Sequence, residues 1–470
     1  MENRTTDSTE ELFPLLMSSI EKFHWYDSRP SYPNFIFGRL EFGKKIDPSL
    51  AETAWRFALD RQPLAVVQPL KIKRRWHWVS GVNDEAGDSS LMNGGFNYQE
   101  FDSSPEPWNF DECESRLKIS SHLEIRVGSV EESVGDTREE KSGFLTLVYF
   151  AVHHAISDGA GALLVVNEWL TIYSNLEAGQ APTEGLRRLE LRRLSSRNHL
   201  GILRWRYLKH LLKQPVALFG ATKFLVRKSI DLSAQKDTAD GVVRLYPAII
   251  GRWVDGDAVR GLNRESSRLG VTLNSIMLGR LFISLSKFLA MNGGNVRSGW
   301  VRVILPISIR SMSDRWMPAT NRTTIVQLDR HVDGMSFLDG FYQNLDREVR
   351  IIRGWHLDKM FLICIRLLSV FEPLLRHVIG SRKSRGTVVF TNLGEPFRKL
   401  AKSQLYRADF GNDVINQFDL VGPVREGTPL NYTVARHGDR IRVSLHYDGS
   451  VFSVNRANEL LESYVSELLG

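Results

Sequence analysis

Residues 144–161 read FLTLVYFAVHHAISDGAG. The first ten form a nearly continuous apolar, β-favouring run, which is typical of a strand buried on both faces. The run ends at the doublet His153-His154, and a Ser-Asp-Gly turn then precedes an apolar-periodic helix expected over residues 160–176. Proteins of the α/β class commonly place reactive groups where a strand ends. We therefore expect the chemistry of this protein at the turn that holds His154 and Asp158.

The imidazole of His154 suits general-base catalysis. A neutral histidine can take a proton from a hydroxyl or an amine near pH 7, and the carboxylate of Asp158 can fix the turn by pairing with an arginine. Two other interpretations stay open at this stage. The His-His-Asp set could bind a metal ion, although no second cluster offers further ligands at a recognisable spacing. Alternatively, His154 is a buried structural histidine, and Asp158-Gly159 only begins a helix.

Strands and helices alternate on both sides of this motif, which predicts an α/β protein. We expect two halves: residues 1–185 carry the motif, residues 186–240 form a basic amphipathic crossover, and residues 241–470 form the second half. The expected strands are 34–42, 122–130, 144–153, 242–254, 300–309, 323–329 and 387–391, with a hairpin that turns at 437–439. The expected helices are 49–60, 160–176, 271–290, 337–379 and 453–469.

The composition is that of a folded protein with room for an interdomain cleft. The chain has 470 residues, of which 42% are hydrophobic and 24% charged, which excludes a disordered or low-complexity chain. Two cysteines, Cys113 and Cys364, do not make a disulfide framework and favour a reducing compartment. The amino terminus is polar and acidic, unlike a secretory signal, and charges interrupt the apolar stretch 360–380. We therefore expect a cytoplasmic protein without a membrane-spanning helix.

The net charge of +7 is concentrated in one segment. Residues 187–228 contain twelve Lys or Arg and one acid, Glu190, interleaved with aromatic and aliphatic side chains. Such a stretch can attach peripherally to an anionic membrane, or it can be a connecting helix whose charges face water. Nucleic-acid binding is not expected, because no recognition motif accompanies the charge.

Several segments resemble one superfamily. HHAISDG at 153–159 resembles the HHxxxDG signature of condensation domains and chloramphenicol-acetyltransferase-like acyltransferases, which include wax ester synthases and alcohol acetyltransferases. Further segments are similar in the order that this superfamily shows, with Gln62 and Thr320 at two positions where the family has His and Gly. These segments are ALDRQPL at 58–64, VTLNSIMLGRLFISL from Val271, VILPISIR ending at Arg310, Asn321-Arg322, and FTNLGEP at 390–396.

The resemblance implies a fold and a reaction. Two chloramphenicol-acetyltransferase-like subdomains would meet in a V with a substrate tunnel at their interface. His154 would act as general base for transfer of an acyl group from a thioester to a hydroxyl or amine, without a covalent acyl-enzyme. The backbone N–H of Gly159, or Thr391 or Asn392 from the other half, would stabilise the oxyanion.

The resemblance also implies supporting roles. Asp158 would be structural and pair with an arginine, Arg61 being the first candidate and Arg310 the second. His153, one residue before the base, would point to the opposite side of the strand and support the site.

The implied substrates are an acyl thioester and a small-molecule or lipid acceptor. The donor would be acyl-CoA or an acyl-carrier-protein thioester, and neither a bound cofactor nor a metal is expected. Two other functions stay open. The protein could be a condensation enzyme that acts in trans on carrier-protein-bound substrates, or a non-catalytic binding or scaffold member of the fold.

Overall fold

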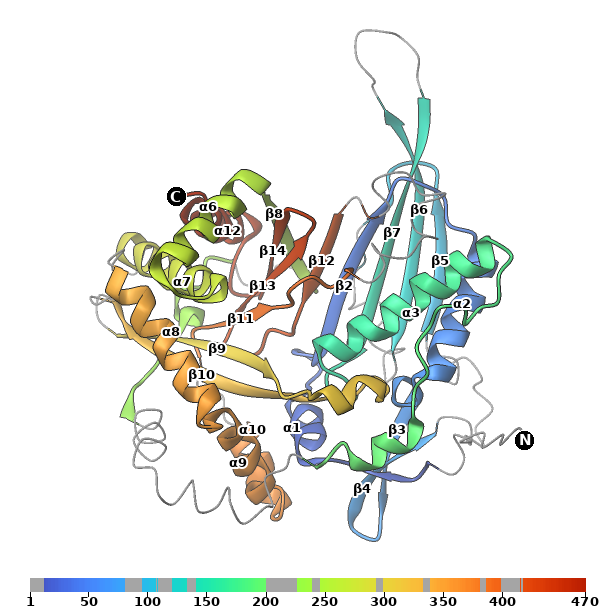
Figure 1. Cartoon of the computed structure of the whole chain (residues 1–470), viewed down its shortest axis with the longest axis horizontal. Coiled ribbons are helices and arrows are strands. Elements are labelled where there is room, and N and C mark those ends of the chain that lie inside the picture. Colours follow the sequence, from blue (N-terminus) through green and yellow to red (C-terminus); the bar gives the residue numbers. More distant parts are fainter. Residues whose placement is uncertain are drawn as a thin grey trace.

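The computed structural model describes residues 12–80, 95–106, 108, 121–132, 141–199, 226–238, 246–292, 299–332, 339–380, 386–398, 415 and 417–470. Within these residues the chain forms two α/β halves that stand side by side (Figure 1).

The amino-terminal half is built on a five-stranded sheet with the order β12-β2-β7-β6-β5. Two helices pack on this sheet and form a shared core with it. The first begins where Pro48 follows the N-cap Asp47, whose side chain accepts a hydrogen bond from the N–H of Leu50. The strands are β2 (Phe35–Phe42), β5 (Gly95–Phe101), β6 (His122–Glu132), β7 (Lys141–His153) and β12 (Gln417–Val421), and the helices are α2 (Pro48–Arg61) and α3 (Gly159–Glu177).

A short helix and a small sheet complete this half. The helix α1 (Ser19–Asp27) begins with a capping box between Ser18 and Glu21. It lies at the base of the two halves in Figure 1. The small sheet has the order β1-β4-β3, from β1 (Leu15–Leu16), β3 (Val67–Ile72) and β4 (Arg75–Ser80).

The carboxyl-terminal half is built on a six-stranded sheet with the order β10-β9-β11-β13-β14-β8. One face of this sheet forms a core with four helices, and another helix pair packs against α1. The strands are β8 (Ala248–Val254), β9 (Trp300–Ser308), β10 (Thr323–His331), β11 (Val388–Asn392), β13 (Leu430–His437) and β14 (Arg440–Tyr447). The core helices are α6 (Gly256–Leu269), α7 (Leu273–Asn292), α8 (Asp339–Gly354) and α12 (Val454–Leu469). The helices α9 (Met360–Leu368) and α10 (Glu372–Gly380) are the pair that packs against α1.

One strand departs from the expected division at residue 241. Strand β12 is antiparallel to β2 and so joins the amino-terminal sheet. Its Asp419 is buried and pairs with Arg39 on β2 at 2.7 Å and with Arg442 on β14 at 2.9 Å. The carboxylate therefore links the amino-terminal and carboxyl-terminal sheets through two ion pairs.

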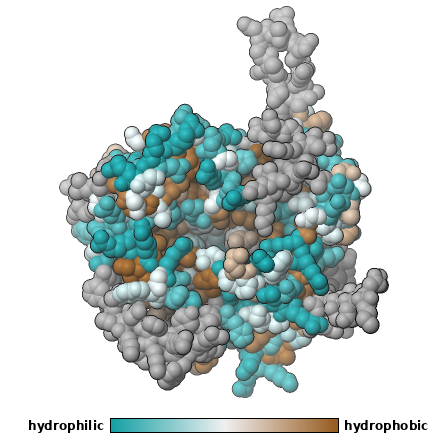
Figure 2. Space-filling view, viewed as in Figure 1, coloured by the Kyte–Doolittle hydropathy of each residue, from teal (hydrophilic) through white to brown (hydrophobic). Residues whose placement is uncertain are grey.

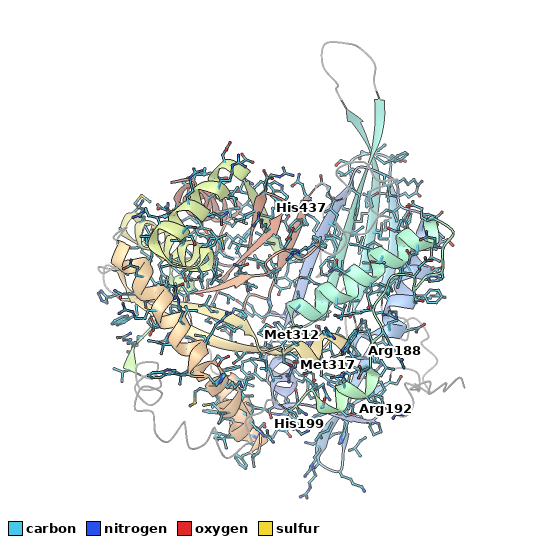
Figure 3. All side chains as sticks on the ribbon, viewed as in Figure 1. Arg188, Arg192, His199, Met312, Met317 and His437 are labelled. Atoms are coloured by element: carbon cyan, nitrogen blue, oxygen red, sulfur yellow. The ribbon has the colours of Figure 1, made fainter. Side chains whose placement is uncertain are left out.

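The basic stretch 187–228 is described only at its ends, because residues 200–225 lie outside the described part of the chain. In the described part, Arg197 is buried and pairs with Glu21 at 2.6 Å. The N–H of Glu190 donates to the carbonyl of Trp316. Figure 3 shows Arg188 and Arg192 near Met312 and Met317 in the same region. This part of the stretch therefore packs along the junction of the two halves.

Among the described residues, α7 is long and apolar enough to cross a membrane, but 67% of its apolar window is buried inside the protein. This burial is what a core helix shows. Cys364 has a free, exposed thiol, while Cys113 lies outside the described residues.

Candidate active site

His154 follows the last residue of β7 and lies between the two halves. Its N–H donates to the carbonyl of Asn34 at 2.8 Å, which extends the contact between β2 and β7 by one residue. On the other side, the amide nitrogen of Asn321 donates to the carbonyl of His154 at 2.8 Å and lies 3.3 Å from its Nδ1. Both halves therefore fix the backbone at this histidine.

The ring of His154 is stacked on the ring of His24, with centroids 4.0 Å apart and an interplanar angle of 8°. His24 comes from the last turn of α1 and is held by Asn34, whose amide nitrogen donates to its carbonyl at 3.0 Å. No sequence motif pointed to His24, because α1 contacts β7 only through the tertiary fold. The stack holds the His154 imidazole in one plane.

Burial sets the protonation of these rings. It lowers the pKa of His154, while the ring's hydrogen bond to its own carbonyl and the carboxylate of Asp158 offset part of this effect. Burial, reinforced by His154, lowers the pKa of His24 well below its usual value. Both rings are therefore neutral at pH 7, as a general base must be.

His153 lies away from the cavity described below. Its ring packs edge-on against Phe35, and its Nδ1 accepts a hydrogen bond from the N–H of Ala155 at 3.0 Å. Burial, with a smaller contribution from His154, lowers its pKa to about 3. This geometry gives His153 a supporting place in the turn.

Asp158 is the N-cap of α3 and collects four hydrogen bonds. Its Oδ1 accepts from the N–H of Gly161 at 2.9 Å. Its Oδ2 accepts from the guanidinium of Arg310, from the N–H of Arg322 at 2.8 Å and from the hydroxyl of Thr323 at 2.7 Å. Burial alone would raise the pKa of Asp158, but Arg310 and these hydrogen bonds lower it. The carboxylate is thus ionised, and it connects α3 to the segment that leads into β10.

The expectation that Arg61 is the first partner of Asp158 is wrong. Arg61 lies at the end of α2 and pairs with Glu168 on α3 at 3.1 Å. Asp158 lies at the amino terminus of α3, and within the described residues its guanidinium partner is Arg310 of the carboxyl-terminal half. Gln62, which follows Arg61, donates to Glu168 at 2.8 Å and accepts from the N–H of Ala319 at 2.6 Å. Its amide therefore links α2, α3 and the second half.

A cavity of about 320 Å³ is lined by five of the expected site residues. Figure 2 shows hydrophobic residues among polar ones near the middle of the face that it draws. Gly159 is the first residue of α3, so its N–H has no acceptor within the helix. Asn392 uses its side chain on Asn274 and on the N–H of Gly394. The expected site residues that line the cavity are His154, Asp158, Gly159, Thr391 and Asn392.

No group of three His, Cys, Asp or Glu side chains that could hold a metal ion occurs in the described part of the chain.

No family model and no curated protein matches this sequence. Solved structures do match it over nearly its whole length. The first condensation domain of the calcium-dependent antibiotic synthetase, in complex with a substrate analogue, has a TM-score of 0.62 and 15% identity, covering 97% of this chain and 95% of that one. The trichothecene 15-O-acetyltransferase from Fusarium sporotrichioides has a TM-score of 0.64 and 11% identity, covering 97% and 94%.

A third match is the starter condensation domain of rhizomide synthetase in complex with C8-CoA. It has a TM-score of 0.61 and 12% identity, and the match covers 97% of this chain and 94% of that one. The chain therefore has the two-subdomain fold of condensation domains and chloramphenicol-acetyltransferase-like acyltransferases, which confirms the fold that HHAISDG predicted.

Proposed function

We propose that this protein is an acyltransferase that moves an acyl group from a thioester to a hydroxyl or amine, with His154 as general base. One observation carries the proposal: a neutral imidazole is held in a fixed plane at a cavity that both halves line. The solved structures of this fold include an acetyltransferase and a condensation domain bound to C8-CoA, which supports acyl transfer.

The proposed step uses the two nitrogens of the ring differently. We assign the proton of the neutral ring to Nδ1, which can donate to the carbonyl of His154 itself, and we assign the base role to Nε2. As the acceptor oxygen or nitrogen attacks the thioester carbonyl, its proton passes to Nε2. The C–S bond then breaks and the proton passes to the departing sulfur, which gives an ester or amide and a free thiol.

The oxyanion formed in this step needs a preorganised donor, which commonly lowers the barrier by about 3 kcal/mol. Gly159 and Thr391 both line the cavity, and we propose the N–H of the first or the hydroxyl of the second as this donor. Asn392 is less suited, because its amide nitrogen already donates to Asn274 at 3.0 Å. Asp158 stays structural, since four hydrogen bonds occupy its carboxylate.

Acyl-CoA is the donor we propose, as a substrate and not as a resident cofactor. The test is release of thiol from acyl-CoAs of two to sixteen carbons in the presence of pooled alcohols and amines. The His154→Ala variant should lose about two to four orders of magnitude in rate. His77→Ala is the matched control, because His77 lies on the exposed β3–β4 hairpin and should keep full activity.

The other outcomes separate the remaining functions. Thiol release that requires an acyl-carrier protein in place of CoA would identify a condensation enzyme that acts in trans. No release from either donor, with His154→Ala unchanged in every assay, would leave a non-catalytic scaffold.

We also propose peripheral contact with an anionic membrane through the basic stretch 187–228, apart from Arg197, which is buried and paired with Glu21. The charge and the aromatic residues of this segment support it. The protein should sediment with anionic vesicles at low salt and detach as salt rises. Failure to sediment at any salt concentration would exclude this contact.

A further inference from the structure

The wall that the carboxyl-terminal sheet gives to the cavity has an apolar part and a polar part. Side chains alternate between the two faces of a strand, so one set faces the helices and the other faces the cavity. Strands β9, β10 and the start of β11 give the cavity Ile304, Pro306, Ile325 and Val389. The next strand in the sheet, β13, instead gives Asn431 and Thr433. The apolar part suits an acyl chain. The polar part, on β13, suits a group that forms hydrogen bonds.

The polar part contains two oxygens without a partner. Both Asn431 and Thr433 are only 2% exposed, and within the described residues Asn431 Oδ1 and Thr433 Oγ1 have no hydrogen-bond partner. The amide nitrogen of Asn431 donates to the carbonyl of Pro423 at 3.2 Å, which fixes the direction of its oxygen. Buried polar atoms in proteins nearly always have a partner. Both residues line the cavity, so a group bound there could donate a hydrogen bond to either oxygen.

A third such oxygen lies on the other wall. Asn34 is 4% exposed and lines the cavity, and its Oδ1 has no partner among the described residues. Its amide nitrogen donates to the carbonyl of His24, and its own carbonyl accepts the N–H of His154. This oxygen therefore belongs to the immediate surroundings of the general base.

We propose that Asn431 and Thr433, with Asn34 opposite, form a subsite for a second hydroxyl or amino group of the acceptor, distinct from the group that is acylated. This inference rests on the proposed function and names the class of its acceptor. Amide oxygens only accept hydrogen bonds, so the bound group must donate, as a hydroxyl or an amine does. The acceptor is therefore a polyol or an amino alcohol and not a simple alcohol.

The test compares acceptors that differ only in the second group: 1-butanol, 1,2-butanediol and 2-amino-1-butanol. The wild type should show a kcat/KM at least about tenfold higher for the diol or the amino alcohol than for 1-butanol, since a site built to bind a polar group rejects the analogue that lacks it. Thr433→Val keeps the shape and removes the hydroxyl. It should lower kcat/KM for the preferred acceptor about tenfold and leave 1-butanol unchanged.

Two control variants accompany it. Thr433→Ser retains the hydroxyl and should keep the preference. Thr171→Val removes a hydroxyl on α3 that donates to the carbonyl of Asn167. This variant should leave kcat/KM unchanged for all three acceptors. Equal kcat/KM for all three acceptors in the wild type would overturn the proposal. So would a Thr433→Val variant that raises KM for acyl-CoA with every acceptor alike, because the subsite would then bind the amides of the donor.

Failure of the subsite and failure of the proposed function give different results. Hydrolysis of acyl-CoA without any acceptor, lost in His154→Ala, establishes the reaction whatever the acceptor preference. If no turnover occurs at all, saturation-transfer NMR with 1,2-butanediol still tests the subsite. A signal in the wild type that is lost in Thr433→Val supports it, and equal or absent signals in both overturn it.

Discussion

At the scale of single residues, the stacking of His24 on His154 determines how the proposed base works. The two rings are nearly parallel, and α1 brings His24 there from a part of the sequence 130 positions earlier. With His24 in place, one face of the His154 ring is shielded from water. Burial is the main cause of the lowered pKa of His154, so His24 acts as a positioning residue that also keeps the base neutral.

Replacement of His24 should therefore change the pH profile. In His24→Ala, water reaches the exposed face of the His154 ring, and the pKa of His154 rises toward its usual value. Because the base must be neutral, the acid limb of kcat/KM should move to higher pH, and the rate at pH 7 should fall roughly 10- to 100-fold as the ring loses its fixed plane.

His24→Phe is the control, because a flat ring keeps the stack and the shielding. Its acid limb should stay close to that of the wild type. The charged and titratable groups around His154 are the same in both variants, namely Asp27, Asp158 and His153. An unshifted acid limb in His24→Ala would show that His24 does not set the protonation of the base.

At the scale of elements, the sequence predicted the strands, turns and helices that are determined by residues close together in the chain. The apolar run of β7, the Ser-Asp-Gly turn and the periodic helix α3 follow one another along the chain, and the structure places them at 141–153 and 159–177. The hairpin β13–β14 turns at Gly438, whose φ of 60° favours glycine. Each of these elements is determined by residues that are close together in the sequence, so the sequence alone predicts it.

Elements held by distant partners could not be found in this way. Strand β12 has five residues and pairs with β2 across about 380 positions of sequence, and nothing in QFDLV specifies that partner. For the same reason, Arg61 was wrongly preferred to Arg310 as the partner of Asp158. The resemblance supplied both arginines, but it did not show which end of α3 each one faces. Gln62 looked like a departure from the family pattern, yet its amide bridges Glu168 and Ala319.

At the scale of the whole molecule, neutral buried histidines tie folding to pH, and His24 and His153 do so most strongly. His24 and His153 are 8% and 2% exposed, and burial lowers the pKa of both. An unfolded chain takes up protons at these histidines once the pH falls below about 6.5, whereas the folded protein does not. The unfolded state then binds more protons, so the free energy of unfolding decreases as the pH falls from about 6.5 toward the lowered pKa values.

The expected loss is large compared with the stability of a typical domain. Each histidine contributes about 1.4 kcal/mol per pH unit, so the pair contributes about 3 kcal/mol per unit, against a typical total of 5–15 kcal/mol. The lowered pKa of Asp158 and Asp419 acts only at lower pH, because these carboxylates lose their contribution as the pH falls below about 3.8. Urea unfolding at pH 7, 6, 5 and 4.5 should therefore show a steep decrease that begins above the range in which carboxylates titrate.

The variant His153→Asn tests the cause of this decrease. An asparagine oxygen can accept the N–H of Ala155 in place of His153 Nδ1, and it does not titrate. The variant should be less stable than the wild type at pH 7, because it loses the packing against Phe35, but its stability should depend on pH by about 1.4 kcal/mol per unit less. A slope equal to that of the wild type would mean that acid unfolds the protein through other groups.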